Sequence, residues 1–286
     1  MYERFYGLRE KPFALTPDPD FLYLGRHHSR ALLQLEYGLA NDAAFVLITG
    51  EVGSGKTTLV RYLLKRFDAG STVGLIANTA RGTGRLLQWV CSAYGLDIAG
   101  KDDVTLYNTF VDFVIDEYAE GRRVVLIVDE SQNLGRARLE ELRVLSNVNV
   151  DKHLLLQIVL VGQPELRDLI RMPQLRQFAQ RIGADYHLGT LSAAETTQYV
   201  KHRLKVAGAS RPNIFRTAAL QLVHASSRGI PRLVNQLCDT ALVYGYAEQR
   251  ERIDDALMRD VIRDRCAGGI FPGAMVVKDT PTDGAQ

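Results

Sequence analysis

The chain has 286 residues, of which 46% are hydrophobic and 24% charged, with 24 glycines and 9 prolines. This is the composition of an ordinary globular protein, and it excludes collagen-like, low-complexity and wholly disordered chains. The 35 lysines and arginines nearly balance the 33 aspartates and glutamates, so no overall charge demands a nucleic-acid or anionic-membrane partner.

The first 190 residues are predicted to form a helix followed by an α/β domain. Two prolines exclude a helix from residues 15–20, whereas residues 27–40 have an apolar face with helical spacing. Short apolar runs then alternate with helical segments, which is typical of a parallel sheet covered on both faces. Strands are expected at residues 45–49, 73–77, 124–128, 155–161 and 184–188. Helices are expected at residues 56–67, 83–94, 106–120 and 136–147.

After residue 191 the strand pattern ends and a small helical subdomain is expected. Its predicted helices are residues 193–207, 217–227, 231–248 and 254–265. The glycines, prolines and lack of periodicity after them indicate a flexible tail. The predicted division is therefore an N-terminal segment at 1–43, an α/β core at 44–190, a helical subdomain at 191–265 and a tail at 266–286.

The cysteines and the apolar runs bear on cellular location. Cys91, Cys238 and Cys266 are far apart in the sequence, which favours reduced thiols over a disulfide framework or a metal site. No apolar run approaches the roughly 20 residues that a membrane-spanning helix needs, and the charged first residues do not resemble a secretory signal peptide. We expect a cytoplasmic protein with no direct membrane span, reaching the inner membrane only through a partner.

The strongest motif is GEVGSGKT at residues 50–57, which matches the phosphate-loop pattern between a predicted strand and a predicted helix. Its glycines allow backbone N–H groups to surround a β-phosphate at a helix N-terminus. Lys56 can reach the β- and γ-phosphates, and Thr57 can offer its hydroxyl to Mg²⁺. The alternative is a glycine-rich turn that binds nothing. The expected nucleotide-binding residues are Gly50, Glu51, Val52, Gly53, Ser54, Gly55, Lys56, Thr57 and Thr58.

Two acids follow the predicted strand at 124–128, where ligands bind in open α/β sheets. Asp129 can hold Mg²⁺, together with Thr57, and Glu130 can polarise the attacking water. Alternatively, the acids cap the next helix. A carboxylate beside the metal-binding acid favours hydrolysis over transfer to a metabolite, and the chain has no Asn-Lys-x-Asp guanine signature. The sequence therefore predicts ATP hydrolysis with ATP and Mg²⁺.

Further polar residues are candidates whose roles depend on position. Gln163 follows the strand at 155–161. If that strand lies between the strand before the phosphate loop and the strand before the acid pair, Gln163 faces the γ-phosphate or its water; otherwise it caps a helix. Arg176 and Arg181 precede the last strand, where a guanidinium can stabilise phosphate charge or simply lie on the surface. Arg232 lies in a first helical turn, where a cation is unfavourable unless a phosphate is near. The alternative is an exposed arginine whose unfavourable interaction with the helix dipole is screened by solvent.

In this order, the phosphate loop, the acid pair, Gln163, Arg181 and the Gly-x-Pro-Arg at 229–232 resemble the AAA+ ATPases, which are P-loop NTPases. The runs around residues 5–19, 48–53, 129–134 and 161–166 are similar to the general secretion pathway protein A (ExeA-type) branch. The likeness covers about residues 1–265 and extends to the secretion ATPases of exosortase and exopolysaccharide loci. The core also resembles transposition ATPases of the TniB, MuB and TnsC type.

This resemblance implies a parallel five-stranded sheet flanked by helices, with residues 191–265 as a helical lid and the N-terminal segment lining the adenine. It implies a homo-oligomer, either a hexameric ring or a helical filament, with ATP at the subunit interfaces. Lys56 and Glu130 would act in the chemistry. Gln163 would be a first sensor, Arg181 a finger reaching a neighbouring subunit's ATP, and Arg232 a second sensor.

The resemblance leaves two clients open. One is a protein partner in a machine for envelope secretion or exopolysaccharide export, which the ATPase would assemble or remodel. The alternative is double-stranded DNA, on which an ATP-dependent filament would select transposition targets. Arg81, Arg85 and the basic excess of residues 191–265 are the features that could contact DNA.

Overall fold

The computed structural model describes residues 1–67, 69–77, 84–150, 153–211 and 213–268, and these form two compact units. We call them the sheet unit, Arg26–Val52 and Lys56–Gly189, and the helical unit, Met1–Gly25, Gly53–Gly55 and the described part of Thr190–Gln286. The predicted N-terminal segment is thus divided, since its first 25 residues belong to the helical unit. Of the predicted tail, residues 269–286 lie outside the described residues.

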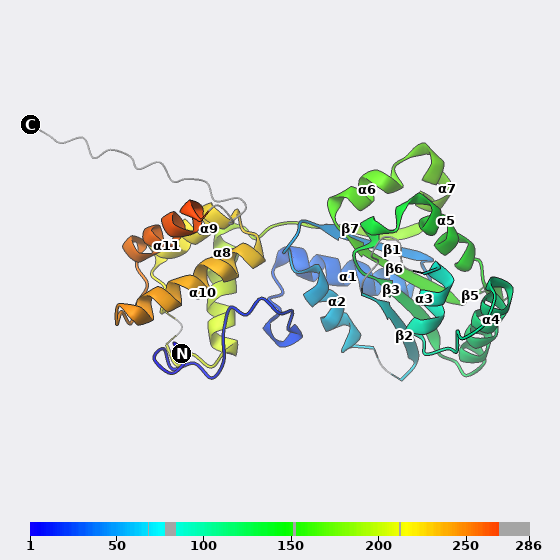
Figure 1. Ribbon diagram of the computed structural model, residues 1–286, viewed down its shortest axis with the longest axis horizontal. Helices are drawn as coiled ribbons and strands as arrows, with labels where there is room; N and C mark the ends of the chain where they lie inside the picture. The colour runs from blue at the N-terminus through cyan, green and yellow to red at the C-terminus, as the bar shows by residue number, and fades with distance from the viewer. Residues whose placement is uncertain (68, 78–83, 151–152, 212, 269–286) are drawn as a thin grey trace, which may run out of the picture. The chain divides into compact units, whose positions relative to one another are not determined.

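The sheet unit contains five parallel strands in the order β2-β3-β6-β1-β7 (Figure 1). The predicted fold class is confirmed, with each strand within about two residues of its expected position. The strands are β1 (Phe45–Gly50), β2 (Ser71–Ile76), β3 (Arg123–Val128), β6 (Leu156–Gly162) and β7 (Ile182–Leu188). A separate antiparallel pair, β4 (Asn149–Val150) and β5 (His153–Leu154), was not expected from the sequence.

Helices cover the sheet because its central strands are apolar on both faces. Every residue of β1 and β6 is buried, and such strands need cover on two sides. The long helices are α1 (Arg26–Ala40), α2 (Lys56–Leu64), α3 (Leu86–Ala93), α4 (Asp103–Ala119) and α5 (Gly135–Leu145). The helix α6 (Pro164–Ile170) was considered only in the alternative that Gln163 caps a helix, and α7 (Arg176–Ala179) was not predicted, since both are too short to show helical periodicity in the sequence.

Strand register places the functional candidates at one edge of the sheet. Thr49 of β1 lies opposite Gly162 of β6, and Leu160 of β6 lies opposite Val128 of β3. The carboxyl ends of three neighbouring parallel strands therefore meet. The residues that follow them are brought to the same edge.

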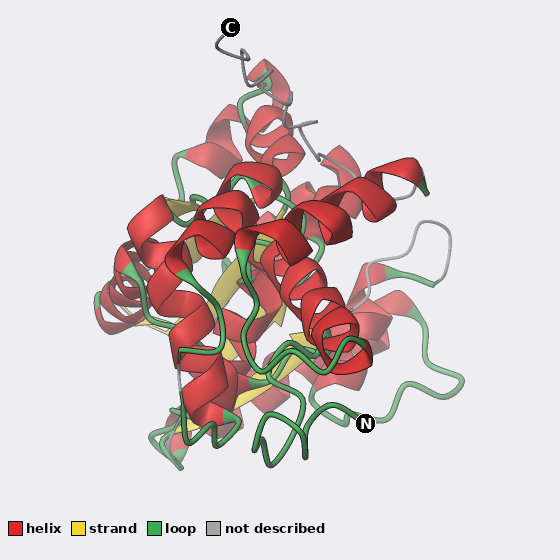
Figure 2. Cartoon of the chain, turned by 90° about the vertical axis from the view of Figure 1, so that its left-hand side faces the viewer, coloured by secondary structure: helices red, strands yellow, loops and turns green. Residues whose placement is uncertain are grey.

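The helical unit has its own hydrophobic core, built from four helices and the start of the chain. The helices are α8 (Ala193–Val206), α9 (Thr217–Ser227), α10 (Pro231–Ala247) and α11 (Asp255–Ala267), which are labelled in Figure 1; Figure 2 draws them in red with all other helices of the chain. Ser192 and Glu195 form a capping box that starts α8, and Asp254 caps α11. Tyr2, Tyr6, Leu8 and Phe13 are buried in the same core, which anchors the N-terminal residues to it.

Two findings concern the cysteines and membrane spans. Cys91 and Cys238 are buried, Cys266 is partly buried, and all three are free thiols. None of the described helices combines the length and apolar character that crossing a bilayer requires.

A partly buried ion pair joins α4 to the residue just before β3. Arg122 donates two hydrogen bonds to Glu117, 2.7 Å from Nε to Oε2 and 2.6 Å from Nη2 to Oε1. The hydroxyl of Thr72 on β2 also donates to Glu117. The bonds from Arg122 lower the pKa of Glu117 to about 2, although burial acts in the opposite direction.

We predict that Glu117→Gln weakens the acid sensitivity of folding. Because the folded-state pKa of Glu117 lies below its ordinary value of 4.5, its ionised form stabilises the fold above about pH 4.5. That contribution is lost as the pH falls toward 2. The free energy of unfolding of the wild type, measured by urea denaturation, should therefore fall more steeply across this window than that of Glu117→Gln. Glu141→Gln, which alters an exposed acid, is the control, and equal slopes for all three proteins would contradict the prediction.

Candidate nucleotide site

The phosphate-loop motif lies between β1 and α2 in the structure, as its sequence context requires. Gly53 and Gly55 have φ angles of 80° and 99°, a left-handed region that other residues adopt only with strain. Lys56 begins α2 and is buried. Its Nζ donates to the carbonyl oxygens of Gly50 at 2.7 Å and Glu51 at 3.0 Å. The ammonium is thus held inside the loop, where an anion entering the loop would meet it.

The Lys56 ammonium is largely shielded from water and lies near two acidic side chains. Desolvation lowers the pKa of Lys56, while the nearby charges of Glu130 and Asp129 act in the opposite direction. A phosphate group would add negative charge beside the same ammonium. Nucleotide binding should therefore favour the protonated amine.

Asp129 connects α2, the helix that follows the phosphate loop, to the end of β3. Its Oδ2 accepts a hydrogen bond from Thr57 Oγ1 at 3.0 Å, and its Oδ1 accepts one from the Glu130 N–H at 2.9 Å. Its own N–H donates to the Ile76 carbonyl at 2.8 Å. Burial raises the pKa of Asp129, and the bonds from Glu130 and Thr57 oppose that rise. The carboxylate is therefore fixed beside the Thr57 hydroxyl.

A hydroxyl and a carboxylate side by side suit Mg²⁺, which prefers oxygen ligands. Mg²⁺ usually keeps several waters and binds through one or two carboxylates together with substrate phosphates. Within the described residues there is no group of three or more His, Cys, Asp or Glu side chains that could hold a metal ion. Thr57 and Asp129 are thus suited to a magnesium ion that arrives with a nucleotide.

Glu130 does not act as a helix cap, although it precedes a short 3-10 helix, η2 (Ser131–Asn133). Its side chain makes no capping hydrogen bond. Its Oε2 instead accepts from Gln132 Nε2 at 2.6 Å and from Gln163 Nε2 at 3.2 Å. The backbone of Glu130 is left-handed, with φ 53° and ψ 36°, which turns the chain sharply after β3. The buried hydroxyl of Ser131 supports this turn by donating to the Val128 carbonyl at 2.7 Å.

Gln163 lies where the sequence argument required it to be for a role near the nucleotide. Its strand, β6, is between β1 and β3. The residue occupies the N-cap position of α6, yet its side chain makes no capping bond and donates to Glu130 instead. The structure therefore brings Lys56, Thr57, Asp129, Glu130 and Gln163 to one edge of the sheet.

Of the candidate arginines, Arg181 has its partners elsewhere in the sheet unit. Arg181 Nη1 donates to the Arg143 carbonyl at 3.1 Å and to Ser146 Oγ at 2.6 Å, so this cation binds the C-terminal end of α5, where a positive charge is favourable. Arg176 is exposed at the start of α7. Arg232 is exposed in the first turn of α10. Its backbone N–H donates to the carbonyl oxygen of Gly53 in the phosphate loop at 3.1 Å, and both residues belong to the helical unit.

Sequence reasoning missed Gln132. Besides its bond to Glu130, its Oε1 accepts from the Gln163 N–H at 3.0 Å. The available signal was an amide side chain two residues after the candidate base, within a turn. That signal has meaning only when the end of β6 is known to lie beside it.

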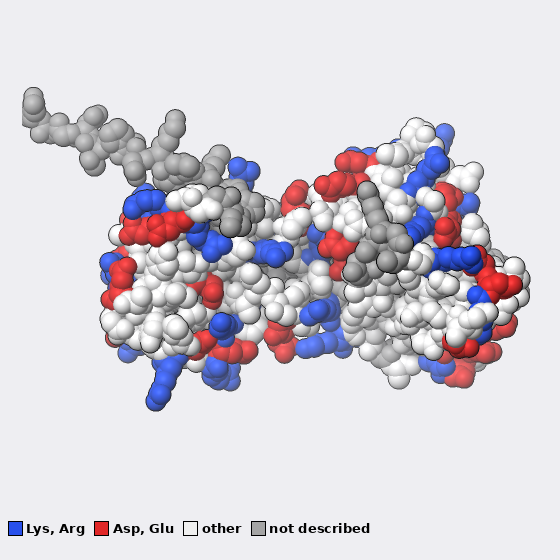
Figure 3. All heavy atoms as spheres, viewed as in Figure 1, with Lys and Arg blue, Asp and Glu red and all other residues white. Residues whose placement is uncertain are grey.

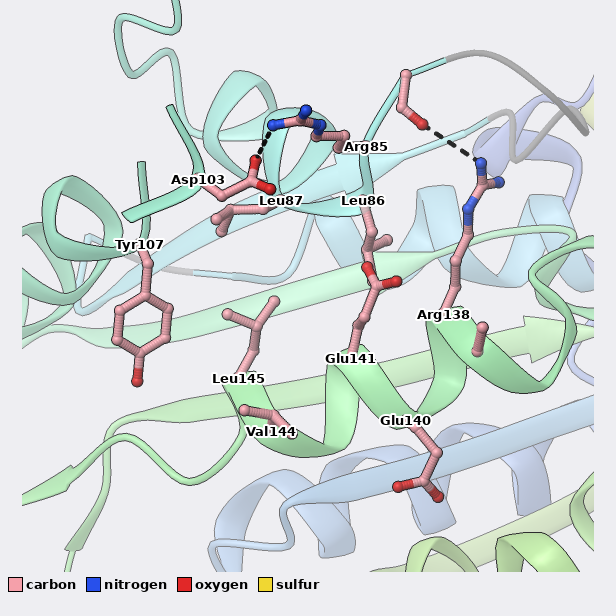
Figure 4. Close-up of a pocket in the computed structure, with 12 residues that line it drawn as sticks. Arg85, Leu86, Leu87, Asp103, Tyr107, Arg138, Glu140, Glu141, Val144 and Leu145 are labelled. Atoms are coloured by element: carbon pink, nitrogen blue, oxygen red, sulfur yellow. Dashed lines mark hydrogen bonds and ion pairs between the residues drawn. The ribbon is translucent and has the colours of Figure 1, made fainter. Parts of the chain in front are cut away.

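A groove lies away from these residues. Its volume is about 770 Å³, and it is lined by the first residues of α3 and α4 and by one side of α5. Figure 4 shows Arg85 bonded to Asp103 and Arg138 bonded to the Gly84 carbonyl at its rim, with Tyr107 and Leu145 among its apolar lining. None of the predicted site residues lines this groove.

Comparisons with known proteins concern the family and the fold of the chain. A family model described as an AAA domain matches residues 40–170. General secretion pathway protein A of Aeromonas hydrophila is 43% identical over 254 residues, which cover 88% of this chain and 46% of that protein. The chain thus spans about half the length of this curated relative.

Two solved structures show a similar fold. The Aeropyrum pernix ORC2 protein in its ADPNP-ADP complexes has a TM-score of 0.64 at 19% identity, covering 89% of this chain and 71% of that one. The Aeropyrum pernix ORC1 protein in complex with DNA also has a TM-score of 0.64, at 17% identity, covering 90% and 69%. At such identities the likeness establishes the AAA+ P-loop architecture alone.

Proposed function

We propose that this chain, which has the AAA+ P-loop fold and is related to general secretion pathway protein A, hydrolyses ATP with Mg²⁺ in an assembly of identical subunits. The observation that carries this proposal is the convergence of the phosphate loop, Asp129, Glu130 and Gln163 at one edge of the sheet. Each of these groups matches a requirement of phosphoryl transfer, in which positioned charge matters more than covalent chemistry.

The phosphate loop would bind the triphosphate. Its backbone N–H groups and the N-terminus of α2 offer positive potential to the β-phosphate. Lys56 would exchange its bonds to the Gly50 and Glu51 carbonyls for bonds to phosphate oxygens. Thr57 and Asp129 would hold Mg²⁺, which neutralises charge on the phosphates when bound.

Glu130 would orient the attacking water and accept its proton. The water oxygen forms a bond to the γ-phosphorus as the bond from that phosphorus to the β–γ bridging oxygen breaks, giving ADP and inorganic phosphate. Gln163 would contact the γ-phosphate or the water, because its amide already lies 3.2 Å from the Glu130 carboxylate. The rest of the expected nucleotide contacts, from the other loop residues and Thr58, belong to the same proposal.

An arginine from a neighbouring subunit would complete the site. We assign this role to Arg181, with Arg176 as the exposed alternative, because a guanidinium can stabilise charge developing on the phosphates. Arg232 would act as a second sensor and the N-terminal segment would line the adenine. Such an assembly, either a hexameric ring or a helical filament, couples hydrolysis to oligomerisation.

The proposed client is a protein of an envelope secretion or exopolysaccharide export machine. The 43% identity to general secretion pathway protein A supports this choice. The ATPase would assemble or remodel that partner, and through it act at the inner membrane. The whole relative is longer than this chain, so this role is proposed for the ATPase part alone.

Double-stranded DNA is the alternative client. The fold is shared with a DNA-bound ORC1 protein, and the helical unit has an excess of basic residues. Figure 3 shows Lys and Arg interspersed with Asp and Glu on the visible described surface of each unit. Arg85 is already paired with Asp103 at 2.6 Å, whereas Arg81 lies outside the described residues. The mixed surface charge and the ion pair between Arg85 and Asp103 favour the protein client.

We predict that Glu130→Gln lowers ATP hydrolysis by at least about 100-fold, the usual contribution of a general base. ATP binding should persist, because the phosphate loop is unchanged. Phosphate release and titration with a fluorescent ATP analogue measure the two effects. Lys56→Ala should instead abolish binding, and Glu141→Gln should leave both unchanged. Full hydrolysis by Glu130→Gln would show that Glu130 is not the base.

A mixing experiment tests whether Arg181 acts across a subunit interface. Arg181→Ala and Glu130→Gln should each be inactive alone. In a mixture, a Glu130→Gln subunit can supply Arg181 to the intact Glu130 of its neighbour, so hydrolysis should reappear. Circular dichroism checks that Arg181→Ala keeps its fold despite losing the bonds to α5. If the mixture stays inactive while a mixture made with Arg176→Ala recovers, Arg176 is the finger.

Electron microscopy with ATP separates the two clients. We expect oligomers to form without DNA and to remain unchanged when duplex DNA is added at moderate salt. Filaments that require DNA and are lost at higher salt, as phosphate contacts are, would instead establish the alternative.

A further inference from the structure

We propose that Gln132 is a positioning residue that holds the Glu130 carboxylate and joins it to the end of β6. This inference rests on the proposed role of Glu130 as the base. It assigns a task to a side chain that neither the phosphate-loop motif nor the acid pair includes.

The geometry is a closed set of three hydrogen bonds. Gln132 Nε2 donates to Glu130 Oε2 at 2.6 Å, and Gln132 Oε1 accepts from the Gln163 N–H at 3.0 Å. Gln163 Nε2 then donates to the same Glu130 oxygen at 3.2 Å. One amide thus connects the candidate base to both the backbone and the side chain of the candidate sensor.

The two partners of Gln132 also determine which way its amide faces. A flipped amide would place its oxygen against the Glu130 carboxylate and its NH₂ group against the Gln163 N–H. Both contacts would join two acceptors or two donors. The orientation that donates to Glu130 is therefore the one that both neighbours require.

The local backbone is arranged around this amide. The left-handed turn at Glu130 leads directly into η2, which carries Gln132. On the opposite side, Gly162 leaves the necessary space, since a Cβ there would lie 3.0 Å from Gln132 Oε1 and 2.8 Å from Leu166 Cδ2. A larger residue at 162 would crowd the amide at its contact with β6.

This arrangement has a mechanistic consequence. When Gln163 contacts a γ-phosphate or its water, the Glu130 carboxylate keeps the shorter of its two amide bonds, the one from Gln132. The carboxylate then stays oriented while the sensor contacts substrate. Because misplacement of a catalytic group by about 1 Å can cost about 100-fold, Gln132 should affect the rate of hydrolysis much more than ATP binding.

Gln132→Met provides the test, because methionine approximates the size of glutamine without its hydrogen bonds. We expect kcat to fall by about 10- to 100-fold, with less than about a twofold change in KM and in the Kd of a fluorescent ATP analogue. Gln132→Asn, whose amide is too short to span both partners, should lose kcat similarly and serves if the methionine variant does not fold. Asn133→Ala, in the same short helix, is the matched control and should keep the wild-type kcat.

A second measurement separates positioning from a general structural effect. In single-turnover assays with radiolabelled ATP, adding Gln132→Met to Glu130→Gln should lower the residual rate by less than about twofold, since the two side chains act through one carboxylate. A further large loss, or a fall in kcat matched by weaker ATP binding, would overturn the inference.

Different results would overturn the proposed role of Gln132 and the proposed role of Glu130. An unchanged kcat in Gln132→Met and Gln132→Asn, while Glu130→Gln is inactive, would overturn the role of Gln132 and leave the role of Glu130 intact. An active Glu130→Gln would overturn the proposed base itself.

Discussion

The parallel alignment of β1, β3 and β6 is the constraint on which the rest of the site depends. Parallel strands end at the same edge, so the phosphate loop, the acid pair and Gln163 meet there even though Gly50 and Gln163 are far apart in sequence. The register of Thr49 with Gly162, and of Val128 with Leu160, fixes how far each chain end projects. Since both faces of these strands are buried, a slip of one residue would move apolar side chains out of their layer.

A buried cation and a buried carboxylate lie at this edge of the sheet, and the phosphates of a nucleotide can add negative charge beside the cation. Lys56 and Asp129 are buried, and desolvation disfavours the charged form of each, lowering one pKa and raising the other. Their hydrogen bonds offset that cost: loop carbonyls accept from Lys56, while Thr57 and the Glu130 backbone donate to Asp129. Preorganised groups of this kind favour phosphoryl transfer, because little reorientation is needed as charge shifts.

The arginines illustrate how one residue type serves different ends. Arg122 and Arg181 are both engaged within the sheet unit, the first by Glu117 and the second by the end of α5. From the sequence, Arg181 was expected to be either an arginine finger or a surface residue. The residues next to Arg181 in the sequence do not reveal that the end of α5, 35 positions earlier at Ser146, lies beside it in the fold. A finger role in an oligomer would add to this anchoring contact or replace it.

The sequence alone determined the five parallel strands, the four helices that follow residue 191 and the residues of the phosphate loop, because apolar periodicity and an eight-residue motif are local signals. It could not decide whether Gln163 caps a helix or faces the γ-phosphate or its water, since that depends on β6 lying between β1 and β3. The short helix α7 and the contacts of the Gln132 amide could not be predicted from it either. Their positions follow from strand order and packing, which join segments through contacts that no single stretch of sequence contains.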